Sequence, residues 1–251
     1  MQNGSAIVTG AASGIGLAIT KSLLEKGYCV AMLDKDTETG QKVAGQIGNS
    51  AKLIFLACDV SNPREVEDVV QRATARLGHI TVLVNNAGDL GPEGYLVSDD
   101  DSLAAVLAVN LLGPLYMSKR IISHMKEHGG GRIVNVSSIT AIIGSPDYPS
   151  YAAAKAGLVG LTKSLARKYA RNNIRVNCVC PGSVLDTRLL LRSRGSPILP
   201  EERIGLMKKI PIGRALNPSE VAELVIFLVS PGSSGLNGAT IVLDGGEMLG
   251  L

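Results

Sequence analysis

The stretch "AIVTGAASGIGLAI", residues 6–19, decides the fold. Its first part is an apolar, β-branched run typical of a buried strand, and its last part has the spacing of a helix. Between them stand Gly10, Gly14 and Gly16, where the absence of a side chain lets the backbone turn tightly and approach a ligand closely. The stretch therefore predicts a strand, a glycine-rich turn and a helix in direct succession.

The same succession of strand and helix continues along the chain. Short Val/Ile/Leu-rich runs predict strands at 5–9, 28–33, 51–57, 80–84, 132–137, 174–179 and 239–243. Helical patterns lie between them at about 14–26, 37–47, 63–77, 101–127, 151–171 and 218–230. This alternation indicates βαβ units, and continuous apolar strands indicate a parallel sheet covered on both faces. We therefore predict an α/β fold: a single doubly wound Rossmann domain over 1–251, with a seven-stranded parallel sheet and helices on both faces.

The glycine-rich turn is also a candidate dinucleotide site. A helix that starts near Gly14 directs unpaired N–H groups and the positive end of its dipole at the turn, which suits a pyrophosphate. The spacing is G-x-x-x-G-x-G rather than the commoner G-x-G-x-x-G. Asp34 follows the second predicted strand, where a carboxylate can bond the adenosine ribose hydroxyls and repel a 2′-phosphate. This favours NAD over NADP, although Lys35 comes next and Ser13 fills a position where a basic side chain could bind that phosphate.

Composition argues against several other classes of protein. The 251 residues are 45% hydrophobic and 19% charged, as in an ordinary globular protein with a sizeable core. A net charge of +3, two Phe, six Tyr and no Trp give little support for a nucleic-acid partner. No apolar run of about 18 residues predicts a membrane span. Few cysteines and no recognisable secretory leader predict a cytoplasmic protein.

Metal binding is not predicted either. The four cysteines lie in or beside apolar runs, which is typical of buried free thiols. They are Cys29, Cys58, Cys178 and Cys180. The last two alternate in "RVNCVCPG", so both are expected on one face of a strand. A zinc site would need further ligands, and the histidines are scattered along the sequence, at His79, His124 and His128.

Several separate motifs resemble those of the short-chain dehydrogenase/reductase family, and together they cover essentially the whole chain. They are "TGAASGIG" (9–16), "DV" (59–60), "NNAG" (85–88), Asn110 in "AVNLLG", "RIVNVSS" (132–138), "YAAAK" (151–155), "RVNCVCPG" (175–182) and "VLDGG" (242–246). Each is weak alone, but their order and intervals are specific to the family. The resemblance implies an NAD(P)-dependent oxidoreductase that acts on the CH–OH group of a small alcohol, or on the corresponding ketone.

The resemblance also implies the site residues, position by position. The catalytic set would be Ser138, Tyr151, Lys155 and Asn110, with the second serine of the Ser137–Ser138 pair chosen because the family fixes its distance from the tyrosine. The expected cofactor contacts are Gly10, Ser13, Gly14, Ile15, Gly16, Asp34, Asp59, Val60, Asn86, Ala87, Gly88, Tyr151, Lys155, Pro181, Gly182, Val184 and Thr187. The expected cofactor is NAD, with NADP as the alternative, and no metal is implied.

The spacing of "YAAAK" suggests how a phenol can act near neutral pH. Residues i and i+4 share a helix face, so Tyr151 and Lys155 can both point into one cleft. At an effective dielectric near 20, unit charges about 4 Å apart interact by roughly 4 kcal/mol, which corresponds to about three pKa units. The lysine is therefore expected to lower the pKa of the phenol from about 10 toward 7, while burial acts in the opposite direction.

One departure from the family pattern follows the sixth predicted strand. The family places a threonine five residues after Pro181, but here Asp186 holds that position and Thr187 comes next. Either a residue is inserted in "PGSVLDT", which we favour, or the aspartate replaces the threonine. The following segment 187–212, within a stretch of about 185–215, lies where the family carries a substrate lid. Its Arg and Lys residues form either a solvated basic face or an electropositive mouth for an anionic substrate.

The leading interpretation is an enzyme that transfers hydride reversibly between NAD(H) and a secondary alcohol or ketone, with Tyr151 as general acid/base. One alternative is an NADP-dependent 3-oxoacyl-thioester reductase, which Asp34 disfavours. Another is a non-catalytic regulatory protein that keeps only cofactor binding. The resemblance further implies a homo-oligomer, either a tetramer or a dimer, assembled through the helices at 101–127 and 151–171 and through the last strand.

Overall fold

Strands and helices alternate throughout the computed structural model, which describes residues 4–48, 51–91, 98–185 and 210–250. The strands are β1 (Ser5–Thr9), β2 (Cys29–Asp34), β3 (Leu53–Ala57), β4 (Ile80–Asn85), β5 (Gly131–Val136), β6 (Ile174–Pro181) and β7 (Thr240–Leu243). The main helices are α1 (Gly14–Glu25), α2 (Thr37–Ile47), α3 (Pro63–Leu77), α4 (Asp100–Leu107), α5 (Gly113–Glu127), α7 (Pro149–Tyr169) and α10 (Pro218–Val229). Every predicted strand is present, and the predicted helix 101–127 is divided by the π-helical turn η2 (Ala108–Leu112). A short helix, α6 (Thr140–Ile143), was not predicted.

The strands form one parallel sheet of seven, in the order β3-β2-β1-β4-β5-β6-β7. The order reverses between β1 and β4, so the connections on the two sides of this point run in opposite directions away from it. Ligands of such sheets bind outside the carboxyl ends of the strands at this reversal. The predicted doubly wound Rossmann fold is confirmed.

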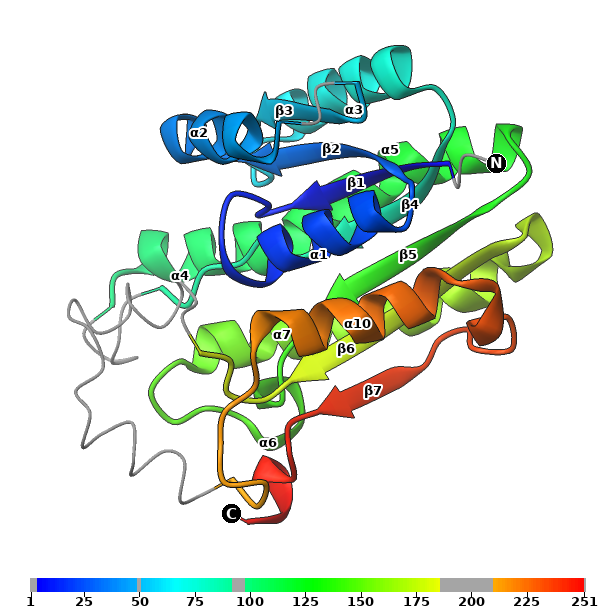
Figure 1. Ribbon diagram of the computed structural model, residues 1–251. Helices are drawn as coiled ribbons and strands as arrows, with labels where there is room; N and C mark the ends of the chain where they lie inside the picture. The colour runs from blue at the N-terminus through cyan, green and yellow to red at the C-terminus, as the bar shows by residue number, and fades with distance from the viewer. Residues whose placement is uncertain (1–3, 49–50, 92–97, 186–209, 251) are drawn as a thin grey trace.

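Helices cover both faces of the sheet, as Figure 1 shows. On one face α1 and α10 pack together, with Ile19, Leu23 and Val225 among the fully buried side chains. On the other face α3 and α5 bury Val66 and Met117 against the strands. Full burial of one such side chain stabilises the folded state by about 1.5–3 kcal/mol. Many such contacts on both faces stabilise the sheet and thereby the positions of the strand ends.

One helical stretch, Asp100–Glu127, has the length and composition of a membrane span. It is 28 residues long, and the mean hydropathy of its most apolar 18-residue window is 1.3. This stretch packs on the sheet: Met117, Ile121 and Met125 are fully buried with residues of β4 and β5. Burial of one apolar stripe against strands is the pattern of a core helix in a layered α/β fold.

The four cysteines are free and buried, as predicted. Cys178 and Cys180 are both fully buried, and their side chains hydrogen-bond to one another, which agrees with their expected placement on one face of β6. Within the described residues, no group of His, Cys, Asp or Glu is arranged to hold a metal ion.

The three histidines, scattered along the sequence, lie together in the fold, which the sequence analysis did not predict. Their ring centroids lie 5.6 Å apart for His79 and His124, 5.0 Å for His79 and His128, and 4.2 Å for His124 and His128. They meet because β4 begins beside the carboxyl end of α5. The Nε2 atom of His124 accepts a hydrogen bond from the Ile80 N–H at 3.1 Å. The Nε2 atom of His79 is buried and has no hydrogen-bond partner within the described part of the chain.

We expect the free energy of unfolding to fall as the pH is lowered through about 6.5. Burial, followed by the neighbouring His128, lowers the pKa of both His79 and His124, and Glu127 opposes this only at His124. Because the unfolded chain then binds protons that the folded protein resists, this contribution is fully present above the unfolded pKa and is lost as the pH falls below it. Between about pH 7.5 and 5.5, the midpoint temperature of thermal unfolding should fall less steeply with decreasing pH for His79→Gln than for the wild type. Identical declines would contradict the assignment to this cluster.

Candidate active site

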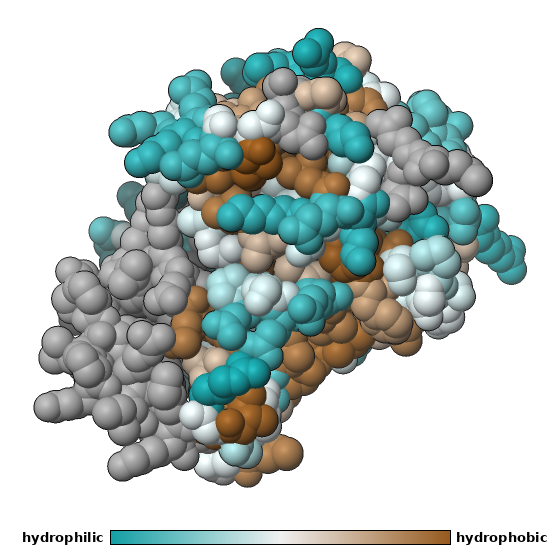
Figure 2. Space-filling model, viewed as in Figure 1, coloured by the Kyte–Doolittle hydropathy of each residue, from teal (hydrophilic) through white to brown (hydrophobic). Residues whose placement is uncertain are grey.

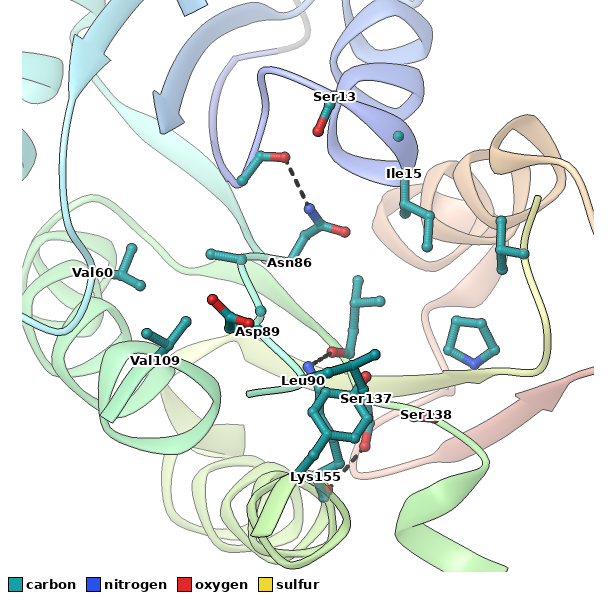
Figure 3. A pocket seen from close by; sticks show the side chains of 18 of the residues that line it. Ser13, Ile15, Val60, Asn86, Asp89, Leu90, Val109, Ser137, Ser138 and Lys155 are labelled. Atoms are coloured by element: carbon teal, nitrogen blue, oxygen red, sulfur yellow. Dashed lines mark hydrogen bonds between the residues drawn. The ribbon is translucent and has the colours of Figure 1, made fainter. Parts of the chain in front are cut away.

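A cavity of about 360 Å³ opens at the carboxyl ends of the parallel strands, a size suited to a small-molecule site. Its wall includes most of the predicted site residues: Gly10, Ser13, Gly14, Ile15, Asp34, Asp59, Val60, Asn86, Ala87, Gly88, Ser138, Tyr151, Lys155, Pro181, Gly182 and Val184. Figure 3 shows how the labelled side chains converge on this space from the ends of the strands and from the neighbouring helices. Gly16 and Asn110 are not part of the wall. Gly16 packs closely against the backbone of Gly10, and Asn110 hydrogen-bonds to the backbone of Asp89; both of these neighbours line the wall.

The glycine-rich turn is fixed from the neighbouring strand. Gly10 has a φ of 63°, a left-handed conformation that favours glycine. The side-chain amide of Asn86, beyond the end of β4, donates hydrogen bonds to the carbonyl oxygens of Thr9 at 3.0 Å and Gly10 at 3.2 Å. The Asn86 amide lies between the turn and the cavity (Figure 3). Gly14 and Ile15 line the cavity at the start of α1, so the positive end of this helix is directed at it.

The acidic end of the cavity is built around Asp34. Its Oδ2 atom accepts a hydrogen bond from the Ala12 N–H at 3.0 Å, and its Oδ1 atom accepts one from the Asp36 N–H at 3.0 Å. The carboxylate is therefore held between the glycine-rich turn and the end of β2. Val60 and Val109 contribute apolar side chains to the wall of the same cavity (Figure 3).

At the opposite end of the cavity, α7 brings Tyr151 and Lys155 together. Both are almost fully buried, and the Lys155 Nζ atom lies 5.4 Å from the centre of the Tyr151 ring. That atom also donates to the Val136 carbonyl oxygen at 2.9 Å. The Ser137 hydroxyl donates to the Lys155 carbonyl oxygen at 2.9 Å, whereas the Ser138 side chain hydrogen-bonds to Tyr151. Among the described residues, Ser138 is the serine of this pair that acts on the phenol, and its catalytic role stays a prediction.

Asn110 connects this end of the cavity to the segment after β4. It stands in the π-helical turn η2 and is fully buried. Its Nδ2 group donates to the Asp89 carbonyl oxygen at 2.6 Å and to the Val106 carbonyl oxygen at 2.8 Å. A Cβ atom on Gly88 would lie 2.8 Å from Asn110 Oδ1 and 3.4 Å from Lys155 Nζ. The glycine thus allows the amide and the ammonium to approach the same point.

The expected lowering of the phenol pKa is not found for these side chains. Burial raises the pKa of Tyr151 above its ordinary value and outweighs the hydrogen bond with Ser138, which acts in the other direction. Burial also lowers the pKa of Lys155 to about 8, although Cys178 and Cys180 favour its charged form. The prediction was wrong for the protein groups alone because desolvation of two neighbouring buried groups exceeds their attraction.

Two comparisons place the chain among known proteins. A family model described as Enoyl-(Acyl carrier protein) reductase matches residues 10–247. The protein named 3-oxoacyl-[acyl-carrier-protein] reductase FabG from Chlamydia pneumoniae is 39% identical over 241 residues, which cover 96% of this chain and 95% of the relative. The chain belongs to the short-chain dehydrogenase/reductase family. It is therefore an oxidoreductase that uses NAD(P) and acts on CH–OH or carbonyl groups.

Further short-chain dehydrogenase/reductase relatives span the full chain. The 2-(S)-hydroxypropyl-CoM dehydrogenase 3 of Xanthobacter autotrophicus is 34% identical over 247 residues, which cover 98% of this chain and 97% of the relative. The crystal structure of 3-ketoacyl-(acyl-carrier-protein) reductase from Brucella melitensis, complexed with NADH, matches with a TM-score of 0.90 at 32% identity, covering 98% of each chain. Relatives of one fold thus include both dehydrogenases and reductases.

The cavity of this short-chain dehydrogenase/reductase also contains acidic residues that the motifs did not mark. Glu247, in the short helix η5 (Glu247–Leu249), accepts hydrogen bonds from the Ser183 N–H at 2.7 Å and the Ser183 hydroxyl at 2.8 Å. It thereby ties the C-terminal segment to the residues that follow β6. Asp89 lines the wall directly after "NNAG", and its adjacency to that motif is the one signal that could have identified it. No pattern in the sequence marked Glu247.

Asp186, Thr187 and most of the predicted lid lie outside the described residues, so the choice between insertion and replacement stays a prediction. The two described flanks of that segment are joined. The Leu185 N–H donates to the Leu216 carbonyl oxygen at 2.9 Å, and the Leu216 N–H donates to the Ser183 carbonyl oxygen at 2.9 Å. The two flanks are therefore paired beside Ser183 and Val184, which line the cavity wall.

Proposed function

We propose that this protein is a single-domain, NAD-preferring dehydrogenase/reductase that interconverts a secondary alcohol and a ketone. The observation that carries the proposal is the placement of Tyr151, Lys155 and Ser138 at one end of the cavity that presents Asp34 at the other. A dinucleotide that spans this cavity has its nicotinamide beside the phenol and its adenosine ribose beside the carboxylate. The lid expected at about 185–215, most of which lies outside the described residues, would cover the substrate.

In the proposed mechanism Tyr151 exchanges a proton with the substrate oxygen. The bound nicotinamide supplies the hydride chemistry. Ser138 hydrogen-bonds the substrate oxygen and holds it beside the phenol, so that carbon and oxygen are oriented for transfer. The raised pKa keeps Tyr151 protonated near neutral pH, which suits donation to a ketone. Removal of a proton from an alcohol requires positive charge near the phenol, and Lys155 is the cation placed to provide it.

The remaining predicted residues have supporting roles. Lys155 would also bond the nicotinamide ribose, and Asn110 would hold a water molecule that relays protons from Lys155 to solvent. Asp59 and Val60 would contact the adenine, and Pro181, Gly182, Val184 and Thr187 would bracket the nicotinamide. Both ends of the proposed relay, Asn110 and Lys155, approach Gly88. This shared neighbour supports a relay between Asn110 and Lys155.

The preference for NAD rests on Asp34. Its carboxylate is already held by two backbone N–H groups, so it cannot turn away from a 2′-phosphate at low cost. We expect kcat/KM with NADH to exceed that with NADPH by at least about tenfold across a panel of ketones. Replacement of Asp34 by Asn should lower the ratio of kcat/KM with NADH to kcat/KM with NADPH, because the amide has the size of the carboxylate but no charge. A wild-type preference for NADPH would overturn the assignment.

The second candidate is an NADP-dependent 3-oxoacyl-thioester reductase. It is supported by relatives from Chlamydia pneumoniae and Thermotoga maritima that are named 3-oxoacyl-[acyl-carrier-protein] reductase, 39% and 36% identical to this chain. Adding acetoacetyl-CoA to the ketone panel distinguishes the two candidate functions. A higher kcat/KM for this thioester with NADPH than for the simple ketones with NADH would support the 3-oxoacyl-thioester reductase. A non-catalytic regulatory role predicts NADH binding without reduction of any ketone, and the complete set around Tyr151 opposes it.

We further propose that the enzyme is a cytoplasmic homo-oligomer, a tetramer or dimer. Figure 2 shows hydrophobic side chains gathered over α10 and β7, where Phe227 and Val242 are exposed, and Leu249 in η5 is exposed as well. On the helical stretch from α4 to α5, Leu112 and Leu115 are exposed as well. Apolar groups on two predicted assembly surfaces favour burial against further copies of the chain. Light scattering coupled to size-exclusion chromatography would measure the molar mass, and hence the number of subunits in the oligomer.

A further inference from the structure

An ion pair spans the adenosine end of the cavity. The Lys35 Nζ atom lies 3.9 Å from Asp89 Oδ2, and both residues line the cavity wall. Lys35 follows β2 directly after Asp34, whereas Asp89 follows the "NNAG" motif after β4. The two side chains are 51% and 35% exposed, so a bound cofactor can reach both of them.

We propose that Asp89 determines cofactor preference by holding the Lys35 ammonium away from the adenosine ribose. The inference rests on the proposed NAD preference and adds a residue that controls it. Lys35 is the cation that a 2′-phosphate would recruit, because it is adjacent to the carboxylate expected to bind the ribose hydroxyls. While its charge is engaged by Asp89, a 2′-phosphate meets Asp34 without a counter-ion.

The charges around Lys35 favour this interpretation. Asp34, Asp36, Asp59 and Asp89 all line the cavity, and the two cations that line it within the described residues are Lys35, paired with Asp89, and Lys155, beside Tyr151. A phosphate that displaced Asp89 from Lys35 would add negative charge to an acidic wall and leave Asp89 without its partner. A half-exposed ion pair contributes little to the stability of the fold. We therefore assign its main effect to selection between cofactors that differ in charge.

The backbone around Asp89 keeps its carboxylate in place. The Asp89 N–H donates to Asn110 Oδ1 at 3.3 Å, and the Asp89 carbonyl oxygen accepts from Asn110 Nδ2 at 2.6 Å. The Asp89 Oδ1 atom accepts the Gly91 N–H at 3.1 Å, so Oδ2 is the oxygen that faces Lys35. Asp89 is thus held by hydrogen bonds to its backbone and to its carboxylate, whereas the Lys35 side chain is half-exposed.

Asp89→Asn is a sharp test because the amide oxygen can still accept the Gly91 N–H while the charge is lost. We would measure the Kd of NADH and NADPH by cofactor fluorescence for the wild type, Asp89→Asn, Lys35→Gln and the double variant. The ratio of Kd for NADPH to Kd for NADH should fall about tenfold in Asp89→Asn. It should return to within about threefold of the wild-type ratio in the double variant, because the gain requires the lysine. Asp68→Asn, which removes an exposed carboxylate on α3 outside the cavity wall, controls for net charge.

Two outcomes would overturn the inference: an unchanged ratio in Asp89→Asn, or an equal gain with and without Lys35. An equal gain would show that Asp89 acts on the phosphate directly. A change of similar size in Asp68→Asn would also overturn it, by assigning the effect to net charge. These readouts measure binding and need no substrate. The wild-type ratio tests the proposed preference for NAD, whereas the change between variants tests the role of Asp89, so the two can fail separately.

Discussion

Replacement of Tyr151 by phenylalanine is expected to lower kcat by about 10³- to 10⁴-fold, the upper part of the range for general acid–base catalysis. The substitution removes one oxygen atom from a side chain that is almost fully buried, and it leaves the ring against Lys155. No other described side chain in the cavity wall combines an ionisable hydroxyl with contact to Ser138. Proton transfer to the substrate oxygen would therefore lose its donor while the cofactor site keeps its shape.

The Kd of NADH should stay within about threefold of the wild-type value in Tyr151→Phe, which separates loss of chemistry from loss of binding. Tyr169→Phe is the matched control, because Tyr169 ends the same helix and packs on the core behind the sheet. That variant should keep kcat within about twofold. Activity of Tyr151→Phe within tenfold of the wild type would remove the phenol from the acid–base role.

The sequence was sufficient for the architecture because each strand carries its own local signal. Runs such as Ile80–Asn85 are apolar on both faces, which only a sheet covered on both sides accommodates. The glycines of the first turn were likewise readable, since Gly10 adopts a positive φ and Gly16 is approached by backbone. These features depend on neighbours a few residues away, and for that reason they can be inferred from the sequence.

Features that depend on tertiary packing could not be inferred in this way. The histidines cluster because the amino end of β4 meets the carboxyl end of α5. No sequence pattern around His79 or His124 predicts that contact. The raised pKa of Tyr151 follows from the depth of burial, which a helical spacing does not contain. Glu247 reaches Ser183 across a long sequence separation, through a fold that had to form first.

Gly16→Ala is expected to raise the Kd of NADH by about 100-fold or more and to lower the free energy of unfolding by about 1–3 kcal/mol, as overpacking in a close-packed site does. A Cβ atom at this position would lie 2.1 Å from the Gly10 carbonyl oxygen and 2.6 Å from the Asn86 Nδ2 atom. The Asn86 amide can rotate away, but the Gly10 backbone can move only if the turn opens. The turn is the predicted binding site of the pyrophosphate, so cofactor affinity and the stability of the fold should decrease together.

Gly160→Ala provides the matched control, because it adds the same methyl group to a helical glycine elsewhere. Nothing lies within 4 Å of a Cβ atom built on Gly160, in the middle of α7. Loss of backbone freedom in the unfolded chain should therefore stabilise that variant by about 0.5–1 kcal/mol, with the Kd of NADH within twofold of the wild type. If contact with Gly10 decides the outcome, chemical denaturation gives changes of opposite sign in the free energy of unfolding for the two variants, and fluorescence titration shows a raised Kd for Gly16→Ala alone. Wild-type affinity in Gly16→Ala would mean that the glycine-rich turn does not hold the dinucleotide.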